Sequence, residues 1–297
     1  MSIQELIQKS LLKTKISQYK TINIVIMDLE RLLSSVLKVN REYLITHSDK
    51  KINKEKITKF NKLLKKYLEN QPLAYIVSRQ EFYGIDFYVD KNVLIPRKET
   101  ELIIDKILEE EEENKIKNKK TKIIDIGTGS GCIIISLAKL LKNTNRKFIA
   151  SDISHQAIKI AKKNAKKNKV ISKIKFIQGN LLEPFKNKIK NNDKIIIIAN
   201  LPYLKKTQIE NSPSIKKEPL LALDGGKNGL ELYKKLLEEI KIIKEKLKKI
   251  NIKIFLEIDP SQTKKIQKII KKKLQNIKIE IIKDLSQKDR LIIIKQI

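Results

Sequence analysis

The stretch "IIDIGTGSGCIII", residues 123–135, contains the turn that decides the fold. Its first four residues are typical of a buried strand, three glycines follow within five positions, and an apolar helix begins near Cys132. Glycine adopts positive φ without steric cost and lets the backbone approach a ligand closely. A strand, a glycine turn and a helix in this order predict a nucleoside site at the switch point of a doubly wound α/β sheet.

The spacing of the glycines indicates which kind of nucleoside-containing cofactor the turn binds. A dinucleotide fingerprint has glycine at its first, third and sixth positions. Here Gly127 and Gly129 are followed by Gly131, and Cys132 occupies the sixth position. This pattern favours a Rossmann-like methyltransferase that uses S-adenosyl-L-methionine over a dehydrogenase. The expected cofactor-binding residues of the turn are Gly127, Thr128, Gly129, Ser130 and Gly131.

Polar residues at the ends of the next two expected strands complete this cofactor site. Asp152 ends "KFIASD", and a carboxylate there can accept hydrogen bonds from both ribose hydroxyls. The alternative for Asp152 is an ordinary turn residue, but the glycine turn favours ribose binding. Asn180 and Leu181 follow the strand "KIKFIQ" and are expected to meet the adenine.

Strand-like and helical segments alternate from Thr121 to the end of the chain. Near-continuous apolar strands of this kind predict a mostly parallel, doubly wound sheet. Only "KDLSQKD" separates the last two strands, which is too short for a parallel crossover, so we expect an antiparallel last strand. Three amphipathic segments before residue 70 predict a small helical bundle, and the alternation after Leu73 predicts a β-hairpin. We expect a helical domain at 1–72, a β-hairpin linker at 73–96 and a methyltransferase domain at 97–297.

The composition excludes several classes of function. The formal net charge is +31 over 297 residues, but the basic residues are nearly all lysines spread along the chain, which favours compositional drift over a nucleic-acid surface. We therefore do not expect direct nucleic-acid binding. Cys132 is the one cysteine and there are two histidines, so we expect no metal site, and Cys132 is expected to be a buried helix residue. No apolar run reaches a membrane span, and we expect a cytoplasmic monomer.

The segment "IIIIANLPYLKK", residues 195–206, brings a carboxamide to the end of another buried strand. The pattern [N/D]-x-P-[Y/F] at this position resembles the motif of methyltransferases that act on planar NH₂ groups. Such a nitrogen shares its lone pair with a π system and is a poor nucleophile. The Asn200 side-chain oxygen and the Leu201 carbonyl can accept its two N–H bonds. Pro202 stiffens the turn, and Tyr203 can pack on the substrate plane.

We therefore expect catalytic roles for Asn200 and Tyr203, with Asn200 also facing the cofactor. A plain strand-to-loop turn is the alternative interpretation of this segment. The glycine turn lies at a suitable distance upstream and favours the catalytic interpretation.

Five segments between about Gln71 and Arg290 resemble one family, the protein-(glutamine-N5) methyltransferases that modify peptide chain release factors. They are "QPLAYIVSRQEFYG", "VLIPRKET", "DIGTGSG", "NLPY" and "EPLLALDGGKNGLELYKKLL". The resemblance implies S-adenosyl-L-methionine as the methyl donor and the glutamine of a Gly-Gly-Gln loop in class I release factors as the substrate. It implies that the substrate side is lined by Leu94, Arg97, Glu99, Asn200, Leu201, Pro202 and Tyr203. The N-terminal helical domain is expected to dock the protein substrate.

Two other functions are compatible with some of these features. Ribosomal RNA adenine-N6 dimethyltransferases also carry "NLPY", and the positive charge would suit them. Their glycine motif lies near the N-terminus and their helical domain at the C-terminus, whereas about 120 residues precede Gly127 here. A basic RNA- or ribosome-binding protein with a relic fold is the non-catalytic alternative, and it would not bind the cofactor.

Overall fold

The computed structural model describes residues 1–14, 21–113, 121–141, 145–213, 215–247 and 249–296. The chain divides into two compact units, Met1–Arg79 and Gln80–Ile297. In the described part of the chain, no helix has the length and apolar character needed to cross a membrane.

The N-terminal unit is the expected helical bundle. Its helices are α1 (Ile3–Leu11), α2 (Ile22–Leu37), α3 (Arg41–Thr46), α4 (Lys54–Leu68) and α5 (Leu73–Val77). Four of them begin after a side-chain cap, and Ser2 forms a reciprocal capping box with Glu5. Leu29 and Leu32 of α2 pack with Phe60 of α4 in a fully buried core, which is the burial that makes short helices stable.

The expected β-hairpin is shorter than the predicted linker. Residues 73–77 form α5, and Leu73, Ile76 and Val77 pack against the helical core of the N-terminal unit. The hairpin itself consists of β1 (Gln80–Phe82) and β2 (Ile85–Phe87), joined by Tyr83 and Gly84, which both have positive φ. A five-residue helix is too short to show a helical period in the sequence, so its apolar residues resembled a strand.

The second unit contains a seven-stranded sheet with the order β5-β4-β3-β6-β7-β9-β8. Its strands are β3 (Thr121–Ile126), β4 (Arg146–Asp152), β5 (Ile174–Gln178), β6 (Lys194–Ala199), β7 (Asn251–Glu257), β8 (Ile277–Lys283) and β9 (Asp289–Gln296). Each of β3 to β7 pairs in parallel, and β9 runs antiparallel to both β7 and β8. The predicted doubly wound sheet with an antiparallel last strand is confirmed.

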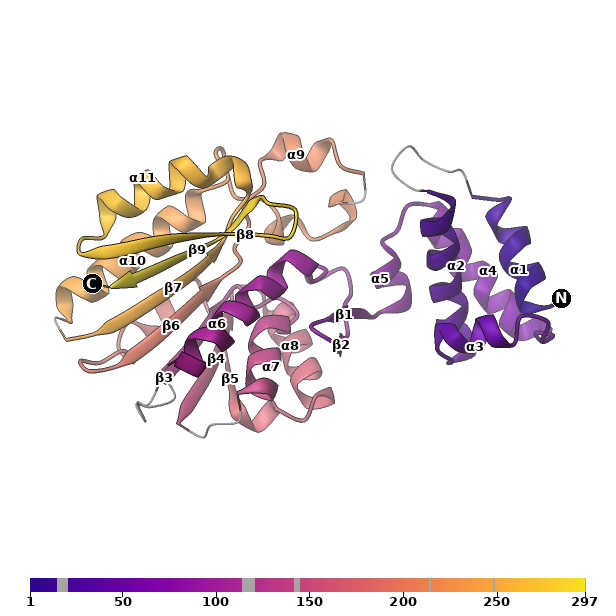
Figure 1. Ribbon diagram of the computed structural model, residues 1–297, viewed down its shortest axis with the longest axis horizontal. Helices are drawn as coiled ribbons and strands as arrows, with labels where there is room; N and C mark the ends of the chain where they lie inside the picture. Colours follow the sequence, from indigo (N-terminus) through magenta and orange to yellow (C-terminus); the bar gives the residue numbers. More distant parts are fainter. Residues whose placement is uncertain (15–20, 114–120, 142–144, 214, 248, 297) are drawn as a thin grey trace. The chain divides into compact units, whose positions relative to one another are not determined.

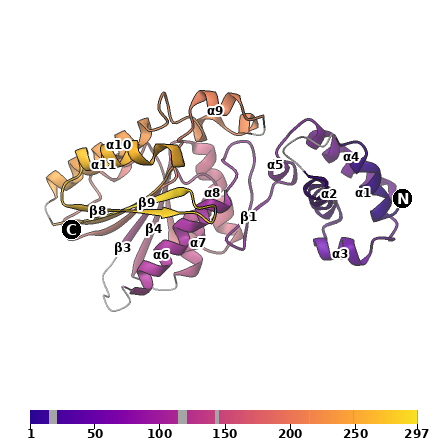
Figure 2. The same cartoon turned by 45° about the horizontal axis from the view of Figure 1, so that its top comes forward.

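Helices cover both faces of this sheet, as Figures 1 and 2 show. One face carries α6 (Glu101–Glu113), α7 (Cys132–Leu140) and α8 (His155–Lys167), and the other carries α10 (Glu231–Lys246) and α11 (Thr263–Lys273); a short α9 (Lys206–Glu210) follows β6. The four isoleucines of β6 alternate between the two cores, which explains the unbroken apolar run. Because β4 and β6 lie on opposite sides of β3, the turns after β3 and β6 meet at the switch point.

Candidate active site

A cavity of about 300 Å³ lies at the carboxyl ends of β3, β4, β5 and β6. Most of the site residues expected from the sequence line it: Leu94, Arg97, Gly127, Thr128, Gly129, Ser130, Asp152, Asn180, Leu181, Asn200, Leu201 and Pro202. Gly131, Glu99 and Tyr203 are not among its lining residues. Parallel sheets bind ligands at this edge, next to the switch point, so the cavity is the candidate active site.

The glycine turn is held by hydrogen bonds to the neighbouring strand. Gly127 and Gly129 have φ of +70° and +55°, which suits glycine. The Thr128 amide donates to the Ser151 carbonyl at 2.9 Å, and the Thr128 hydroxyl donates to Asp125 Oδ2 at 2.6 Å. Burial raises the pKa of Asp125 to about 7, although the Thr128 hydrogen bond lowers it. These contacts present the turn's backbone to the cavity.

Gly131 has a structural role. Its φ is +81°, and a Cβ there would lie 2.8 Å from Ile135 Cδ1 and 3.2 Å from Ala161 Cβ. The residue thus allows α7 and α8 to pack closely behind the turn. A glycine is required at this position even though it does not line the cavity.

Asp152 is anchored so that its carboxylate faces the glycine turn. Its Oδ2 accepts from the Gly129 amide at 2.9 Å, and its Oδ1 accepts from the Ser154 amide at 2.8 Å. Burial raises the pKa of Asp152, and these backbone hydrogen bonds oppose that shift. An ionised carboxylate has about four acceptor positions, so two remain for a ligand diol. The residues present therefore fit the ribose of S-adenosyl-L-methionine.

Asn180 and Leu181 form another wall of the cavity. Leu181 has a φ of +44° and a buried side chain, whereas Asn180 is exposed. A left-handed backbone conformation is uncommon at a bulky residue such as leucine, and it persists only where the surrounding structure stabilises it. Asn180 and Leu181 line the same cavity as Asp152, and their contact with the adenine stays a prediction.

Asn200 lies directly after β6, and its side-chain nitrogen donates a hydrogen bond within the protein. Asn200 Nδ2 donates to Thr100 Oγ1 at 3.2 Å, and the side chains of Thr100 and Glu257 are both buried. Glu257 is the last residue of β7, the strand next to β6. The oxygen of the Asn200 carboxamide is therefore the end that Thr100 does not occupy.

The peptide carbonyl after Asn200 also keeps acceptor capacity. The Leu201 amide donates to Tyr233 Oη at 3.2 Å. The Tyr233 hydroxyl has one proton and two carbonyls within reach, Leu201 O at 3.3 Å and the nearer Glu257 O. A carbonyl oxygen has two lone pairs, so at least one on Leu201 O remains available even when Tyr233 donates to it.

Two glycines of "DGGKNG" hold the turn after Asn200. A Cβ on Gly225 would lie 2.7 Å from the Pro202 carbonyl oxygen, and one on Gly229 would lie 2.2 Å from that of Tyr203. Gln262 Nε2 donates to the same Tyr203 oxygen at 2.8 Å. The "DGGKNG" segment therefore packs tightly against the Asn200–Tyr203 turn and restricts its conformation.

Tyr203 faces Glu257 in this structure. Its hydroxyl donates to Glu257 Oε1 at 3.2 Å, and its ring packs against the core that includes α10 and α11. Burial and the Glu257 charge raise the pKa of Tyr203. Tyr203 does not line the cavity, and its packing on the substrate plane stays a prediction.

The "VLIPRKET" segment closes another side of the cavity. The Ile95 amide donates to Glu218 Oε2 at 3.0 Å, and Arg97 forms an ion pair with Glu218 Oε1. Glu218 is buried, whereas Glu99 is exposed. Sequence reasoning missed Glu218, Thr100, Tyr233 and Glu257. The "EPLLALDGG" segment was recognised but suggested no role for its glutamate.

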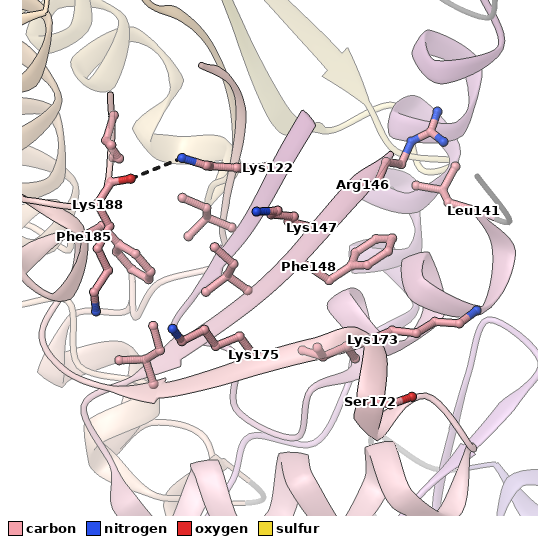
Figure 3. Close-up of a pocket in the computed structure, with 15 residues that line it drawn as sticks. Lys122, Leu141, Arg146, Lys147, Phe148, Ser172, Lys173, Lys175, Phe185 and Lys188 are labelled. Atoms are coloured by element: carbon pink, nitrogen blue, oxygen red, sulfur yellow. Dashed lines mark hydrogen bonds between the residues drawn. The ribbon is translucent and has the colours of Figure 1, made fainter. Parts of the chain in front are cut away.

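A larger cavity of about 750 Å³ lies elsewhere on the same unit. Figure 3 shows it over β3, β4 and β5, with Lys147 and Lys175 projecting into it, and Lys122 donates to the Lys188 carbonyl at 3.2 Å. None of the site residues expected from the sequence lines it. Lys122 and Arg146 stand at the starts of their strands, so this cavity extends to the amino ends, away from the glycine turn.

Comparisons with known proteins indicate the family of the chain. A family model described as a methyltransferase domain matches residues 117–290, and one described as the PrmC N-terminal domain matches residues 20–77. The chain is 34% identical to the release factor glutamine methyltransferase of Bacillus cereus, covering 89% of this chain and 90% of that protein. It is 36% identical to that of Borreliella burgdorferi, over 89% of this chain and 87% of the relative.

A solved structure supports the fold alone. The catalytic domain of hMettl16, in complex with a MAT2A hairpin, superposes with a TM-score of 0.53 at 17% identity, over 72% of this chain and 76% of that chain. The sequence relatives reach much higher identity over most of both chains. This protein therefore belongs to the release factor glutamine methyltransferase family.

Proposed function

We propose that this protein transfers a methyl group from S-adenosyl-L-methionine to the side-chain amide nitrogen (N5) of the glutamine in the Gly-Gly-Gln motif of peptide chain release factors. The observation that carries the proposal is the pair of acceptors after β6. Asn200 and Leu201, the residues that carry these two oxygens, line one cavity together with the glycine turn and Asp152. Family membership supports the choice of substrate.

The cofactor would occupy the half of the cavity next to β3 and β4. Asp152 would accept hydrogen bonds from the ribose hydroxyls, and Asn180 and Leu181 would contact the adenine. Gly127 and Gly129 let the backbone approach the methionine part. When bound, S-adenosyl-L-methionine supplies an electrophilic methyl group.

The residues after β6 would hold the glutamine amide for attack. Asn200 Oδ1 and Leu201 O would accept its two N–H bonds and so orient the NH₂ group with its lone pair, which is perpendicular to the amide plane, towards the cofactor half of the cavity. The same acceptors stabilise the positive charge that develops on the nitrogen. The proton can leave afterwards, so no base with a shifted pKa is needed.

Leu94 and Arg97 would contact the substrate on the opposite wall, since both line the cavity. Glu99 does not line the cavity, and we keep it as part of the proposed substrate side. We keep the expectation that Tyr203 packs on the amide as part of the proposal.

We further propose that the helical unit Met1–Arg79 docks the release factor, because one loop glutamine offers little binding area. A monomer without direct nucleic-acid binding would suffice for this reaction. A substrate that serves translation places the reaction in the cytoplasm.

The test is mass spectrometry of a purified release factor after incubation with the protein and S-adenosyl-L-methionine. We expect the mass of one added methyl on the glutamine of Gly-Gly-Gln. Ribosomal RNA incubated in parallel tests the adenine-N6 alternative. Methylated adenine with an unmodified release factor would overturn the proposal, and absence of cofactor binding by calorimetry would indicate the non-catalytic alternative.

A further inference from the structure

We propose that Glu218 is a positioning residue that holds together two walls of the substrate side of the cavity. The inference rests on the proposed function, because it concerns the binding of the protein substrate at that site. One wall is formed by residues 94–97, and the other by residues 218–223, which we call the rim segment. Members of both walls line the cavity: Leu94, Pro96 and Arg97 from the first, and Pro219, Leu221 and Ala222 from the second.

The Glu218 carboxylate joins the two walls with one oxygen for each of two donors. The Ile95 amide donates to Oε2 at 3.0 Å, and the Arg97 guanidinium donates to Oε1 in an ion pair. The Glu218 side chain is 3% exposed, so these two donors stand in place of water. A buried carboxylate that lost its donors would be strongly destabilised. The contact therefore favours one arrangement of residues 94–97 against the rim segment.

The far end of the rim segment is attached to the chain that follows the Asn200 turn. The Leu204 amide donates to the Leu223 carbonyl at 3.0 Å, and the Gly225 amide donates to the Leu204 carbonyl at 2.9 Å. Glu218 thus anchors the first residue of the rim segment, and Leu204 anchors its last. Three stretches that are distant in the sequence are connected at the substrate side of the cavity.

Between these anchors the rim segment is open to solvent. Leu220 is 56% exposed and Leu221 is 61% exposed, and Leu221 also lines the cavity. Because both residues are more than half exposed, packing contributes little to the position of the segment. The anchors at its two ends therefore determine where this wall lies.

Glu218 also restricts the orientation of Arg97. A guanidinium has five N–H donors in a fixed plane, and donation to Glu218 leaves others available. Without the carboxylate, the protein substrate would have to order both Arg97 and the rim segment when it binds, which lowers affinity. The acceptors at Asn200 and Leu201 have their own contacts, with Thr100 and Tyr233. We therefore expect Glu218 to act on the KM for release factor and much less on kcat.

The kinetic test uses Glu218→Met and Glu218→Gln in the full-length protein, with methyl transfer to a purified release factor. Methionine has a similar length but cannot serve Ile95 and Arg97, and we expect KM to rise by about 10-fold or more, as for loss of a charge-assisted hydrogen bond. Glutamine keeps the shape and one acceptor oxygen, so its KM should lie between those of wild type and Glu218→Met. The kcat and the Kd for S-adenosyl-L-methionine should change little.

Hydrogen exchange measured by mass spectrometry tests the contact without any substrate. The Ile95 amide is protected by Glu218, so residues 93–97 should exchange faster in both variants than in wild type, while β6 and β7 keep their protection. A role in overall stability alone would instead speed exchange throughout the sheet.

Glu110→Met is the matched control. Glu110 is also a buried glutamate with two cationic partners, Lys253 and Lys295, but it lies in α6 and does not line the cavity. This variant should leave the KM for release factor and the exchange of residues 93–97 unchanged.

Wild-type exchange of residues 93–97 in the Glu218 variants would overturn the inference, as would a rise in KM no larger than that of Glu110→Met. If Glu218→Met fails to fold, Glu218→Gln decides: wild-type KM and wild-type exchange would overturn the inference. Inactivity of the wild-type protein towards release factor would refute the proposed function, and the exchange measurement would still decide whether Glu218 holds the two walls.

Discussion

The Gly129 amide donates to Asp152 Oδ2 at 2.9 Å, so the glycine turn after β3 and the acid at the end of β4 form one unit. The Ser154 amide holds the other carboxylate oxygen at 2.8 Å. Both oxygens thus have one fixed partner before any ligand arrives. Such preorganisation lowers the entropic cost of binding.

Asp152→Asn should weaken cofactor binding. An amide NH₂ in place of one oxygen would face a backbone N–H and would remove acceptor positions from the cavity. We expect the Kd for S-adenosyl-L-methionine to rise by about 10-fold or more, corresponding to at least one charge-assisted hydrogen bond, in isothermal titration calorimetry. Asp193→Asn is the control, because Asp193 pairs with Lys122 at the other end of β3. Equal affinities in wild type and Asp152→Asn would contradict ribose binding by Asp152.

Asn200→Ala should abolish most methyl transfer while cofactor binding is largely kept. The variant loses the oxygen that accepts one substrate N–H, and loss of such a group costs about 100-fold or more in kcat. Single-turnover transfer to release factor and calorimetry with S-adenosyl-L-methionine measure the two effects separately. Asn211→Ala, at an exposed helix end, should behave as wild type. Near-normal turnover of Asn200→Ala would show that the proposed mechanism is wrong.

Removal of residues 1–79 should raise the KM for whole release factor by about tenfold or more, because docking area is lost. Transfer to a short peptide with the Gly-Gly-Gln motif should be unaffected, since the cavity is formed within the second unit. Steady-state kinetics with both substrates gives the comparison, and circular dichroism checks that the sheet is retained. An unchanged KM for the whole protein would count against docking by the helical unit.

Asp125 should make the protein less stable as the pH rises. Burial raises its pKa from 3.8 to about 7, so between these values the folded state binds a proton that the unfolded chain has lost. The free energy of unfolding therefore decreases with pH across that window, by at most about 4 kcal/mol from this group.

Urea unfolding of wild type and Asp125→Asn at pH 5 and pH 8 tests this effect. The amide cannot titrate, so the stability of wild type relative to the variant should be greater at pH 5 than at pH 8. A difference that does not vary with pH would show that the Asp125 carboxyl titrates normally. The comparison between the two proteins cancels the many other groups that titrate in both.

The order of the sheet shows how far local patterns reach. The short connection after β8 predicted an antiparallel pair, and β8 and β9 form it. The position of β9 between β7 and β8 was not predictable from the sequence. It depends on which strand pairs with the free edge of β7, and local patterns do not show this. The α5 helix was missed for a different reason, since five residues contain too little of a helical period.

By itself, the sequence determined the strands, the glycine turn, the acid at the end of β4 and the carboxamide after β6, because each depends on a few consecutive residues. Only the tertiary structure decided that Gly131 serves packing, that Tyr203 faces Glu257, and that Thr100 holds Asn200. Those partners lie tens of residues apart or more. A hydrogen bond or a steric contact selects its partner by distance in space, and it leaves no periodic pattern in the chain from which that partner could be read.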